Sequence, residues 1–465
     1  MTPALPDHAT IGPELSAPAP APDRLPRRDQ LGRRPVLGLG ALLPALALGL
    51  SACGEEDGDG GAAPDLRAEV PRADPGPAEG AGELVVPFTA RMLGAVDRAD
   101  INVICSPLSA QVALAMIGMG AAGETLAQME GVLGESMDEL AASGNTLSSV
   151  LAAVGEQERE VADEERPEPA RASLVNGTWL QEGVEVEQSY LEDLATWFGS
   201  GVHEADFVDE AERAAAREEI NGWVAESTDG LIEELLMEGF LRPTTRLVLV
   251  NALHLKAAWP EPLTTAGGRF TTADGEELSC EMLQGGTRTW YEDEVCRATS
   301  LDTYGEDLAL ALVQPTGELA EVLAAWSDGA EDPDAGLAAL LAGLEDSTAT
   351  TQLSVPSFDI GWEASLKELL EGLGMTDAFS GAADFSGVTG QTDLVIDEIV
   401  QKAVITIDEN GMEAAAATAV GVGETSAPVL EQELVLDAPF LVVAYERSTL
   451  APLVVGWIGD PTQTR

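Results

Sequence analysis

The chain is poor in basic residues. Only three of its 465 residues are lysine, and lysine and arginine together number 24, against 81 aspartates and glutamates. The formal net charge is −57. A surface of this sign repels phosphate groups, so we expect no nucleic-acid partner and no charge-driven binding to an anionic membrane. Two interpretations of the acidity stay open. One is solubility or life at high salt, and the other is a binding surface for a basic partner.

Histidine and cysteine are also scarce, with three and four residues. No Cys/His spacing is typical of a metal site, and neither His203 nor His254 lies beside a nucleophile motif. We therefore predict no metal, no cofactor and no enzymatic activity. Cys105 lies in an apolar segment, whereas Cys280 and Cys296 lie on neighbouring predicted strands, so a disulfide between these two is left open.

Residues 1–52 are predicted to be an export signal. An arginine pair, Arg33 and Arg34, precedes an uncharged stretch that ends in "LSAC" at Cys53. The segment resembles a bacterial lipoprotein signal, which would make Cys53 the lipidated first residue of a bacterial or archaeal protein that is extracellular or anchored at the cell surface. Export by the general or by the twin-arginine route stays open. So does an uncleaved membrane span, because the uncharged stretch is long enough to cross a bilayer.

Residues 53–82 are rich in glycine, proline and acidic residues and are predicted to be a flexible tether. The domain proper is expected from residue 83 to residue 465. Removal of residues 1–52 takes away five arginines and four acidic residues, which leaves a net charge of −58. The acidity therefore belongs to the exported part.

Helical and strand patterns alternate along residues 83–465. Apolar residues recur at helical spacing over 109–134 and 214–236, and residues 245–259 form a near-continuous apolar run typical of a buried strand. Further strands are expected within 351–362, 393–408 and 433–445. With no internal repeat, the pattern predicts an α+β fold with one large sheet.

Several segments resemble, in order and spacing, those of the serpins, inhibitors that trap serine proteases by a change of fold. The segments are "NVICSPLSAQVALAM", "INGWVAESTDGLI", "LVLVNALHLKAAW", "DFSG", "VQKAVITIDENGMEAAAATA" and "DAPFLVVAYERSTLAPLVVGWIGDP". The resemblance covers about residues 83–465. It implies the serpin fold: a large, mainly antiparallel central sheet, smaller sheets, surrounding helices and an exposed reactive-centre loop at about residues 409–430.

The segment after Gly411 has the alternating pattern of a strand that could become buried on one side. In a strand, alternate residues share a face, and one face here would carry Met412, Ala414, Ala416, Thr418, Val420 and Val422. Gly411 would serve as the pivot. Helix propensity alone favours the alternative of an alanine-rich helix over 413–420. The resemblance assigns the hinge and inserting role to Glu409, Gly411, Met412, Ala414, Ala415, Ala416, Ala417 and Thr418.

The resemblance implies a suicide-substrate mechanism carried out by a monomer on a partner serine protease, with a covalent acyl-enzyme complex as the product. Counting as the family counts places the reactive bond between Thr425 and Ser426, which suggests an elastase-like or subtilisin-like target. A shift of one residue would present Glu424 to a Glu-specific protease instead. The alternative function is that of a non-inhibitory serpin acting as an extracellular binding or structural protein.

Five further residues match positions that let the central sheet of serpins open. Ser106, Ser109 and Asn251 match the hydrogen-bonded "shutter", and Trp259 matches the tryptophan where insertion begins. Gln401 stands where a histidine is common, so pH sensing through this position is not expected. Ordinary packing is the alternative for each, and Ser106 before Pro107 would also suit a helix N-cap.

Overall fold

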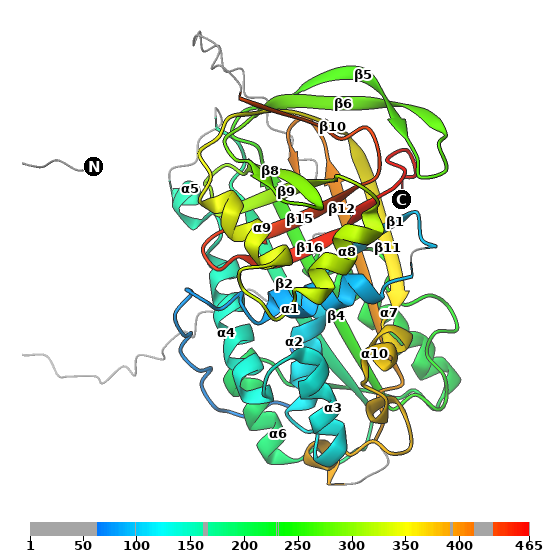
Figure 1. Cartoon of the computed structure of the whole chain (residues 1–465). Coiled ribbons are helices and arrows are strands. Elements are labelled where there is room, and N and C mark those ends of the chain that lie inside the picture. Colours follow the sequence, from blue (N-terminus) through cyan, green and yellow to red (C-terminus); the bar gives the residue numbers. More distant parts are fainter. Residues whose placement is uncertain are drawn as a thin grey trace, which may run out of the picture. The chain divides into compact units, whose positions relative to one another are not determined.

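Six strands build the central sheet, in the order β11-β12-β13-β4-β2-β3 (Figure 1). The computed structural model describes residues 63–97, 99–160, 166–228, 230, 232–390, 394–412 and 431–464. The strands of this sheet are β2 (Arg171–Gln181), β3 (Val202–Ala205), β4 (Leu247–Ala258), β11 (Phe358–Ser365), β12 (Glu398–Ile407) and β13 (Gly411–Met412). Four of the six pairings are antiparallel, and β2–β3 and β12–β4 are parallel.

Two further sheets accompany the central sheet. One has six strands, β1 (Asn102–Cys105), β16 (Ala451–Ile458), β15 (Phe440–Glu446), β9 (Leu308–Pro315), β8 (Cys296–Asp302) and β7 (Tyr291–Glu292), in that order. The other has four, β14 (Gln432–Val435), β10 (Thr351–Pro356), β6 (Glu277–Thr287) and β5 (Thr264–Thr271). The expected α+β fold is confirmed.

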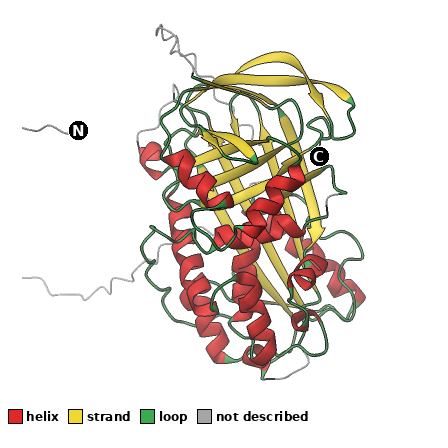
Figure 2. Ribbon diagram, viewed as in Figure 1, coloured by secondary structure: helices red, strands yellow, loops and turns green. Residues whose placement is uncertain are grey.

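Helices pack around these sheets, several of them over one face of the central sheet (Figure 2). They are α1 (Val85–Ala95), α2 (Pro107–Gly118), α3 (Gly123–Leu133), α4 (Met137–Ala153), α5 (Glu156–Glu160), α6 (Gln188–Asp193), α7 (Glu210–Ser227), α8 (Leu319–Asp328), α9 (Gly336–Glu345), α10 (Lys367–Leu373) and α11 (Ser386–Thr389), with a π-helical turn at Leu194–Phe198 and a 3₁₀ turn at Asp377–Phe379. The start of α7 is fixed by Asp209, whose carboxylate accepts hydrogen bonds from the N–H groups of Ala211 and Glu212.

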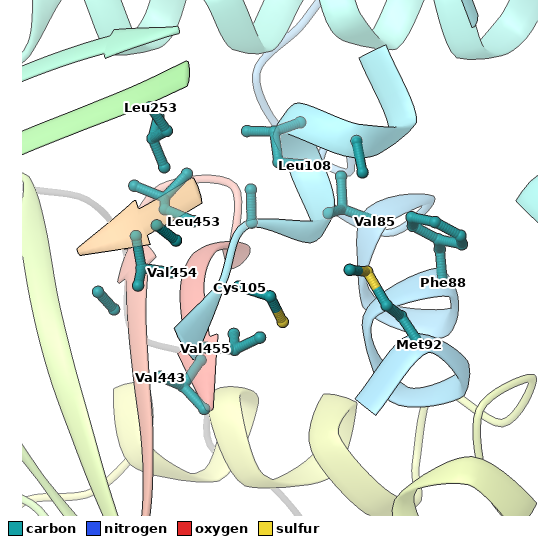
Figure 3. Packing of buried hydrophobic residues seen from close by; sticks show 14 of the residues in the cluster. Val85, Phe88, Met92, Cys105, Leu108, Leu253, Val443, Leu453, Val454 and Val455 are labelled. Atoms are coloured by element: carbon teal, nitrogen blue, oxygen red, sulfur yellow. The ribbon is translucent and has the colours of Figure 1, made fainter. Parts of the chain in front are cut away.

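The main hydrophobic core lies where α1 and α2 meet β1, β15 and β16 (Figure 3). Every residue of α2 is buried, and so is every residue of β15 and β16. A second cluster lies on the other face of the central sheet, where Val248 and Val250 of β4 pack with residues of α7. The central sheet is therefore covered on both faces.

Two predicted helices end earlier than their patterns suggest. The helical pattern over 109–134 is divided between α2 and α3: the backbone is extended at Ala122 and takes a positive φ of 57° at Gly123, and the N–H of Ala122 donates to the carbonyl of Asp384 at 2.9 Å. The pattern over 214–236 is helical only as far as Ser227. In contrast, the buried strand expected at 245–259 is confirmed by β4.

The disulfide left open between Cys280 and Cys296 does not form. Cys280 lies on β6 of the four-stranded sheet and Cys296 on β8 of another sheet, and both are free thiols. Sequence proximity of two predicted strands did not mean that they pair. Burial raises the pKa of both thiols and of Cys105, so none of these three is a reactive thiolate at neutral pH.

The described part of the segment expected to be a tether lies on the domain. Leu66 and Val202 exchange two backbone hydrogen bonds of 2.9 and 2.8 Å, which adds a bridge to the outer edge of β3. Further along, Arg72 Nε donates to Asn145 Oδ1 at 2.7 Å, and Asn145 Nδ2 donates to the carbonyl of Ala73 at 3.0 Å. Composition predicted flexibility here, but hydrogen bonds to the domain order residues 64–76.

Candidate functional site

The central sheet is parted at one end by a short strand. At the other end, β12 and β4 pair directly from Glu398–Val248 to Gln401–Asn251. Beyond this, β13 lies between them, with Met412 opposite Ile407 of β12 and Ala257 of β4. The side chain of Met412 is 2% exposed and belongs to the main core. Met412 therefore already occupies the position of a strand inserted between β12 and β4.

A tight turn holds this short strand in place. The carboxylate of Asp408 accepts hydrogen bonds from the N–H groups of Asn410 (2.7 Å) and Gly411 (3.0 Å). Trp259 binds the same turn twice, from its backbone N–H to the Asn410 carbonyl (2.8 Å) and from its indole Nε1 to the Asp408 carbonyl (3.0 Å). The N–H of Leu263 donates to the carbonyl of Glu409 at 2.7 Å. The turn is thus anchored from two sides.

Gly411 is required by close contact with β4. A Cβ at this position would lie 2.3 Å from the carbonyl oxygen of Ala257 and 2.9 Å from Cα of Ala258. No side chain fits at that distance without a shift of the backbone. Gly411 is not among the glycines with positive φ, so its role as predicted from sequence has a different physical cause: space rather than backbone freedom.

The residues matched to a hydrogen-bonded shutter lie together under the N-terminus of α2, although their side chains do not bond one another. Gln401 Oε1 accepts from the N–H of Ser106 at 3.0 Å, and its Nε2 donates to the carbonyl of Ser106 at 2.7 Å. Among the described residues, the hydroxyls of Ser106 and Ser109 and both amide atoms of Asn251 have no hydrogen-bond partner. Of the residues matched to the shutter, Gln401 alone forms side-chain hydrogen bonds within this described part, and it forms them with the backbone of Ser106.

Ser106 occupies the N-cap position of α2, but its hydroxyl caps no N–H group. The N-cap interpretation therefore holds for the position and is wrong for the hydrogen bond. Gln401 takes over part of this role by binding the backbone of Ser106. Sequence analysis also missed Asp408, whose carboxylate holds the turn before Met412. The Asp-x-Asn-Gly spacing before Met412 is a turn signal that would have found Asp408.

The segment between the two anchors lies outside the described residues. Its far end is held at β14, where the N–H groups of Glu431 and Gln432 donate to the carbonyl of Thr350. The predicted positions that fall outside the described residues are Ala414, Ala415, Ala416, Ala417, Thr418, Glu424, Thr425, Ser426 and, near the N-terminus, Cys53.

The described residues offer no arrangement of catalytic groups. His203 is 5% exposed and stacks on Trp179 with ring centroids 4.6 Å apart, and burial lowers its pKa. Within the described ranges no cluster of His, Cys, Asp and Glu could hold a metal, and no helix there is long and apolar enough to cross a bilayer. What the site offers is a conformational change: β12 and β4 are separated at one end of the central sheet, and β13 forms the first residues of a strand between them.

Comparison with known proteins identifies the family. The family described as "Serpin (serine protease inhibitor)" matches residues 84–461. A serine protease inhibitor of Cyanea capillata is 29% identical over 388 residues, which are 82% of this chain and 97% of the relative. The leukocyte elastase inhibitor of Bos taurus is 29% identical over 378 residues, covering 77% of this chain and 93% of the relative.

A solved structure supports the same assignment at the level of fold. The thermophilic serpin tengpin in its native state superposes with a TM-score of 0.69 at 24% identity, covering 84% of this chain and 97% of that one. Serpins are protease inhibitors and not enzymes, in agreement with the expectation from the sequence. The match over residues 84–461 shows that this chain belongs to the serpin family.

Proposed function

We propose that this chain is a suicide-substrate inhibitor of serine proteases that acts through insertion of the segment after Met412 into the central sheet. The observation that carries the proposal is the position of Met412, buried between β12 and β4 as the first residue of a strand. After Glu413, residues 414–419 are all alanine or threonine, and the chain is anchored again at residues 431 and 432, beside β14. The chain on each side of this segment is held by the domain, at β13 and beside β14. Cleavage would release one of these two connections, so the part that remains joined to β13 could extend the strand between β12 and β4.

The chemistry belongs to the partner protease. Its serine hydroxyl attacks the carbonyl carbon of Thr425, an ester forms there, and the peptide bond to Ser426 breaks, so that Ser426 leaves as a new amino terminus carrying the proton. Water would normally hydrolyse this ester. Before it does, residues 413 onward insert and carry the protease with them. About 14 residues at about 3.3 Å each give a strand about 45 Å long.

The target that fits best has a pocket for a small residue. Thr425 is small and polar, which suits an elastase-like or subtilisin-like enzyme, and one relative is named an inhibitor of leukocyte elastase. If the bond lies one residue earlier, Glu424 enters the pocket and a Glu-specific enzyme becomes the target. Glu424→Gln separates these cases because it should abolish recognition only by the latter.

The test is incubation of the purified protein with pancreatic elastase, subtilisin and a Glu-specific protease, followed by denaturing gel electrophoresis. An inhibitor leaves a covalent complex that survives denaturation. If every protease either leaves the chain intact or yields only fragments, the protein is not an inhibitor of these classes and a non-inhibitory role is favoured.

Ala416→Arg tests insertion of this segment directly, and Ala415→Arg is its matched control. An unpaired guanidinium on the face that becomes buried costs several kcal/mol upon insertion. We expect the variant to fold, to be cleaved and not to trap the protease. Ala415→Arg places the same charge on the opposite face and should impair trapping less. If Ala416→Arg forms complex at the wild-type rate, insertion through this segment is not the mechanism.

We further propose that the protein is exported and held at the cell surface by a lipid on Cys53. The support is the sequence alone, an uncharged stretch that ends in Leu-Ser-Ala-Cys. Cys53→Ser should release the protein from membranes and leave inhibition by the soluble form unchanged. Retention of the variant in the membrane fraction would instead point to an uncleaved span.

A further inference from the structure

The chain contains three Asn-Gly pairs, at residues 176–177, 221–222 and 410–411. Asparagine before glycine is chemically labile, because glycine has no Cβ to keep its backbone nitrogen away from the asparagine side chain. This nitrogen can attack Cγ of the asparagine, close a five-membered succinimide ring and expel ammonia. Water then opens the ring at either carbonyl and leaves aspartate or isoaspartate. The net reaction consumes one water and releases one ammonia.

The fold keeps two of these pairs away from the reactive geometry. Ring closure requires the ψ angle of the asparagine to bring the next nitrogen near its own side chain, and neither a strand nor a helix has that ψ angle. Asn176 lies inside β2, in a ladder of ten residue pairs with β4. Asn221 lies inside α7, where its Oδ1 accepts from the N–H groups of Leu235 and Leu236 and its Nδ2 donates to the Leu236 carbonyl.

Asn410 is placed differently, in the turn between β12 and β13. It is half-buried, and no hydrogen bond within the described part of the chain involves its side-chain amide. Two contacts restrain its backbone: the Gly411 N–H donates to the Asp408 carboxylate at 3.0 Å, and the Asn410 carbonyl accepts from the Trp259 N–H at 2.8 Å. The nitrogen that would attack is thus held by a side chain and not by a strand ladder.

We propose that Asn410 is a deamidation site of the folded protein and that Asp408 is a positioning residue that slows the reaction. The Gly411 nitrogen must leave the Asp408 carboxylate before it can reach Cγ of Asn410. It must also lose its proton, and the negative charge of Asp408 opposes this step. The reaction needs only water and is accelerated by a rise in pH. It does not depend on the proposed inhibitory function.

Isoaspartate at position 410 would remove β13 from the central sheet. It continues the main chain through the side-chain carboxyl, which lengthens the backbone by one methylene group before Gly411. Gly411 has no room to shift, since even a Cβ there would lie 2.3 Å from the carbonyl oxygen of Ala257. Met412 therefore cannot stay opposite both Ile407 and Ala257. The modified protein should lose the short strand between β12 and β4.

The test follows deamidation by peptide mapping with mass spectrometry. The purified chain is kept at mildly alkaline pH, folded in buffer and, in parallel, unfolded in guanidinium chloride. In the unfolded chain we expect deamidation at all three Asn-Gly pairs, whereas the folded chain should react at Asn410 only. The inference is overturned if the folded chain reacts as fast at Asn176 or Asn221, or if it does not react at Asn410 while the unfolded chain does.

Two variants test the role of Asp408. Asp408→Ala frees the Gly411 N–H, and it should raise the rate at Asn410 in the folded chain about 10-fold, the usual weight of a hydrogen bond to a charged group. Asp408→Asn keeps an acceptor oxygen and should stay closer to the wild type. Unfolded, all three proteins should react at Asn410 at one rate. Equal rates of folded Asp408→Ala and folded wild type would show that Asp408 does not slow the reaction.

The effect on β13 is measured on the isoaspartyl form, separated from fresh protein by ion exchange. It should melt about 2–4 °C lower and exchange the Trp259 N–H faster. Asn410→Asp, freshly purified, carries the same charge on a normal backbone and should match fresh wild type in both measurements. Asn410→Gln, which would need a six-membered ring, should not change upon ageing. If the isoaspartyl form matches fresh wild type, the extra methylene group is accommodated and the predicted loss of β13 is wrong.

Discussion

Gln401 and Ser106 bind each other in both directions, through hydrogen bonds of 3.0 and 2.7 Å from one side-chain amide to one backbone residue. The contact joins β12 of the central sheet to the start of α2, 295 positions apart in the sequence. Gln401 is 1% exposed, so water does not compete for these bonds. An amide does not titrate, and the link should be insensitive to pH.

The first prediction concerns this link. Gln401→Leu removes the partner of a buried N–H and one partner of a buried carbonyl, and we expect the free energy of unfolding to fall by about 2–3 kcal/mol. Urea denaturation of the intact protein measures it. An unchanged midpoint would show that the backbone of Ser106 finds other partners and that the link does not hold the sheet to α2.

The second prediction concerns the N-terminal segment. A chain that starts at Pro77 lacks the backbone pair of Leu66 with Val202 and both partners of Asn145, a side chain that is 2% exposed. Relative to a chain that starts at Ala63, it should lose about 2–3 kcal/mol of unfolding free energy. Both chains lack the signal, so the comparison isolates residues 63–76. Equal stability would mean that these contacts contribute nothing net.

The third prediction is a dependence on pH through His203. Burial between Trp179 and Trp223 lowers its pKa, and Asp65 only partly offsets this. The unfolded chain, with a pKa near 6.5, then binds more protons than the folded protein at mildly acidic pH. Stability from the neutral imidazole is complete above pH 6.5 and is lost as the pH falls below it.

His203→Phe removes this titration and keeps an aromatic ring in the stack. Between pH 7.5 and pH 5, the wild type should therefore lose stability relative to the variant, as measured by thermal unfolding. The many carboxylates titrate in both proteins, so their contribution cancels in the difference. Parallel curves would show that His203 has the same pKa in the folded and unfolded states.

Much of the fold followed from local patterns in the sequence. The apolar run of β4 could be predicted because a strand buried on both faces needs no alternation. The break between α2 and α3 could not, since the backbone there forms hydrogen bonds with a segment remote in sequence, from the N–H of Ala122 to the carbonyl of Asp384 and from the N–H of Gly387 to the carbonyl of Gly120. Whether Cys280 and Cys296 form a disulfide could not be decided from the sequence for the same reason: the order of strands in a sheet is set by tertiary packing.

The residues of the site could be predicted from the sequence, but the pairing of residues on neighbouring strands could not. Local residues around Gly411 carried a recognisable pattern, and family resemblance located Asn251 and Gln401. Nothing in the sequence places Asn176 opposite Asn251, because that pairing is fixed by the alignment of β2 with β4 along ten residue pairs. The unpaired amide of Asn251 likewise appears only when its neighbours are known.

The last prediction concerns Gly411 and the strand already begun in the sheet. Gly411→Ala places a methyl group 2.3 Å from the carbonyl oxygen of Ala257, and overpacking of this kind typically costs 1–3 kcal/mol. The simplest relief is withdrawal of β13 from β4, which would expose Met412 and weaken the hydrogen bond from the Trp259 N–H to Asn410. We expect faster hydrogen exchange at Trp259 and a lower melting temperature of the intact protein.

Gly267→Ala is the matched control, because Gly267 also lies in a strand and a methyl group there meets no atom within 4 Å. It should leave both measurements unchanged. The same contact with β4 would persist after insertion, so Gly411→Ala should also divert more of the protein to simple cleavage when a target protease is present. If Gly411→Ala matches the control in melting and in exchange at Trp259, β13 is not held against β4 as described, and the parted sheet would lose its role as the starting point for insertion.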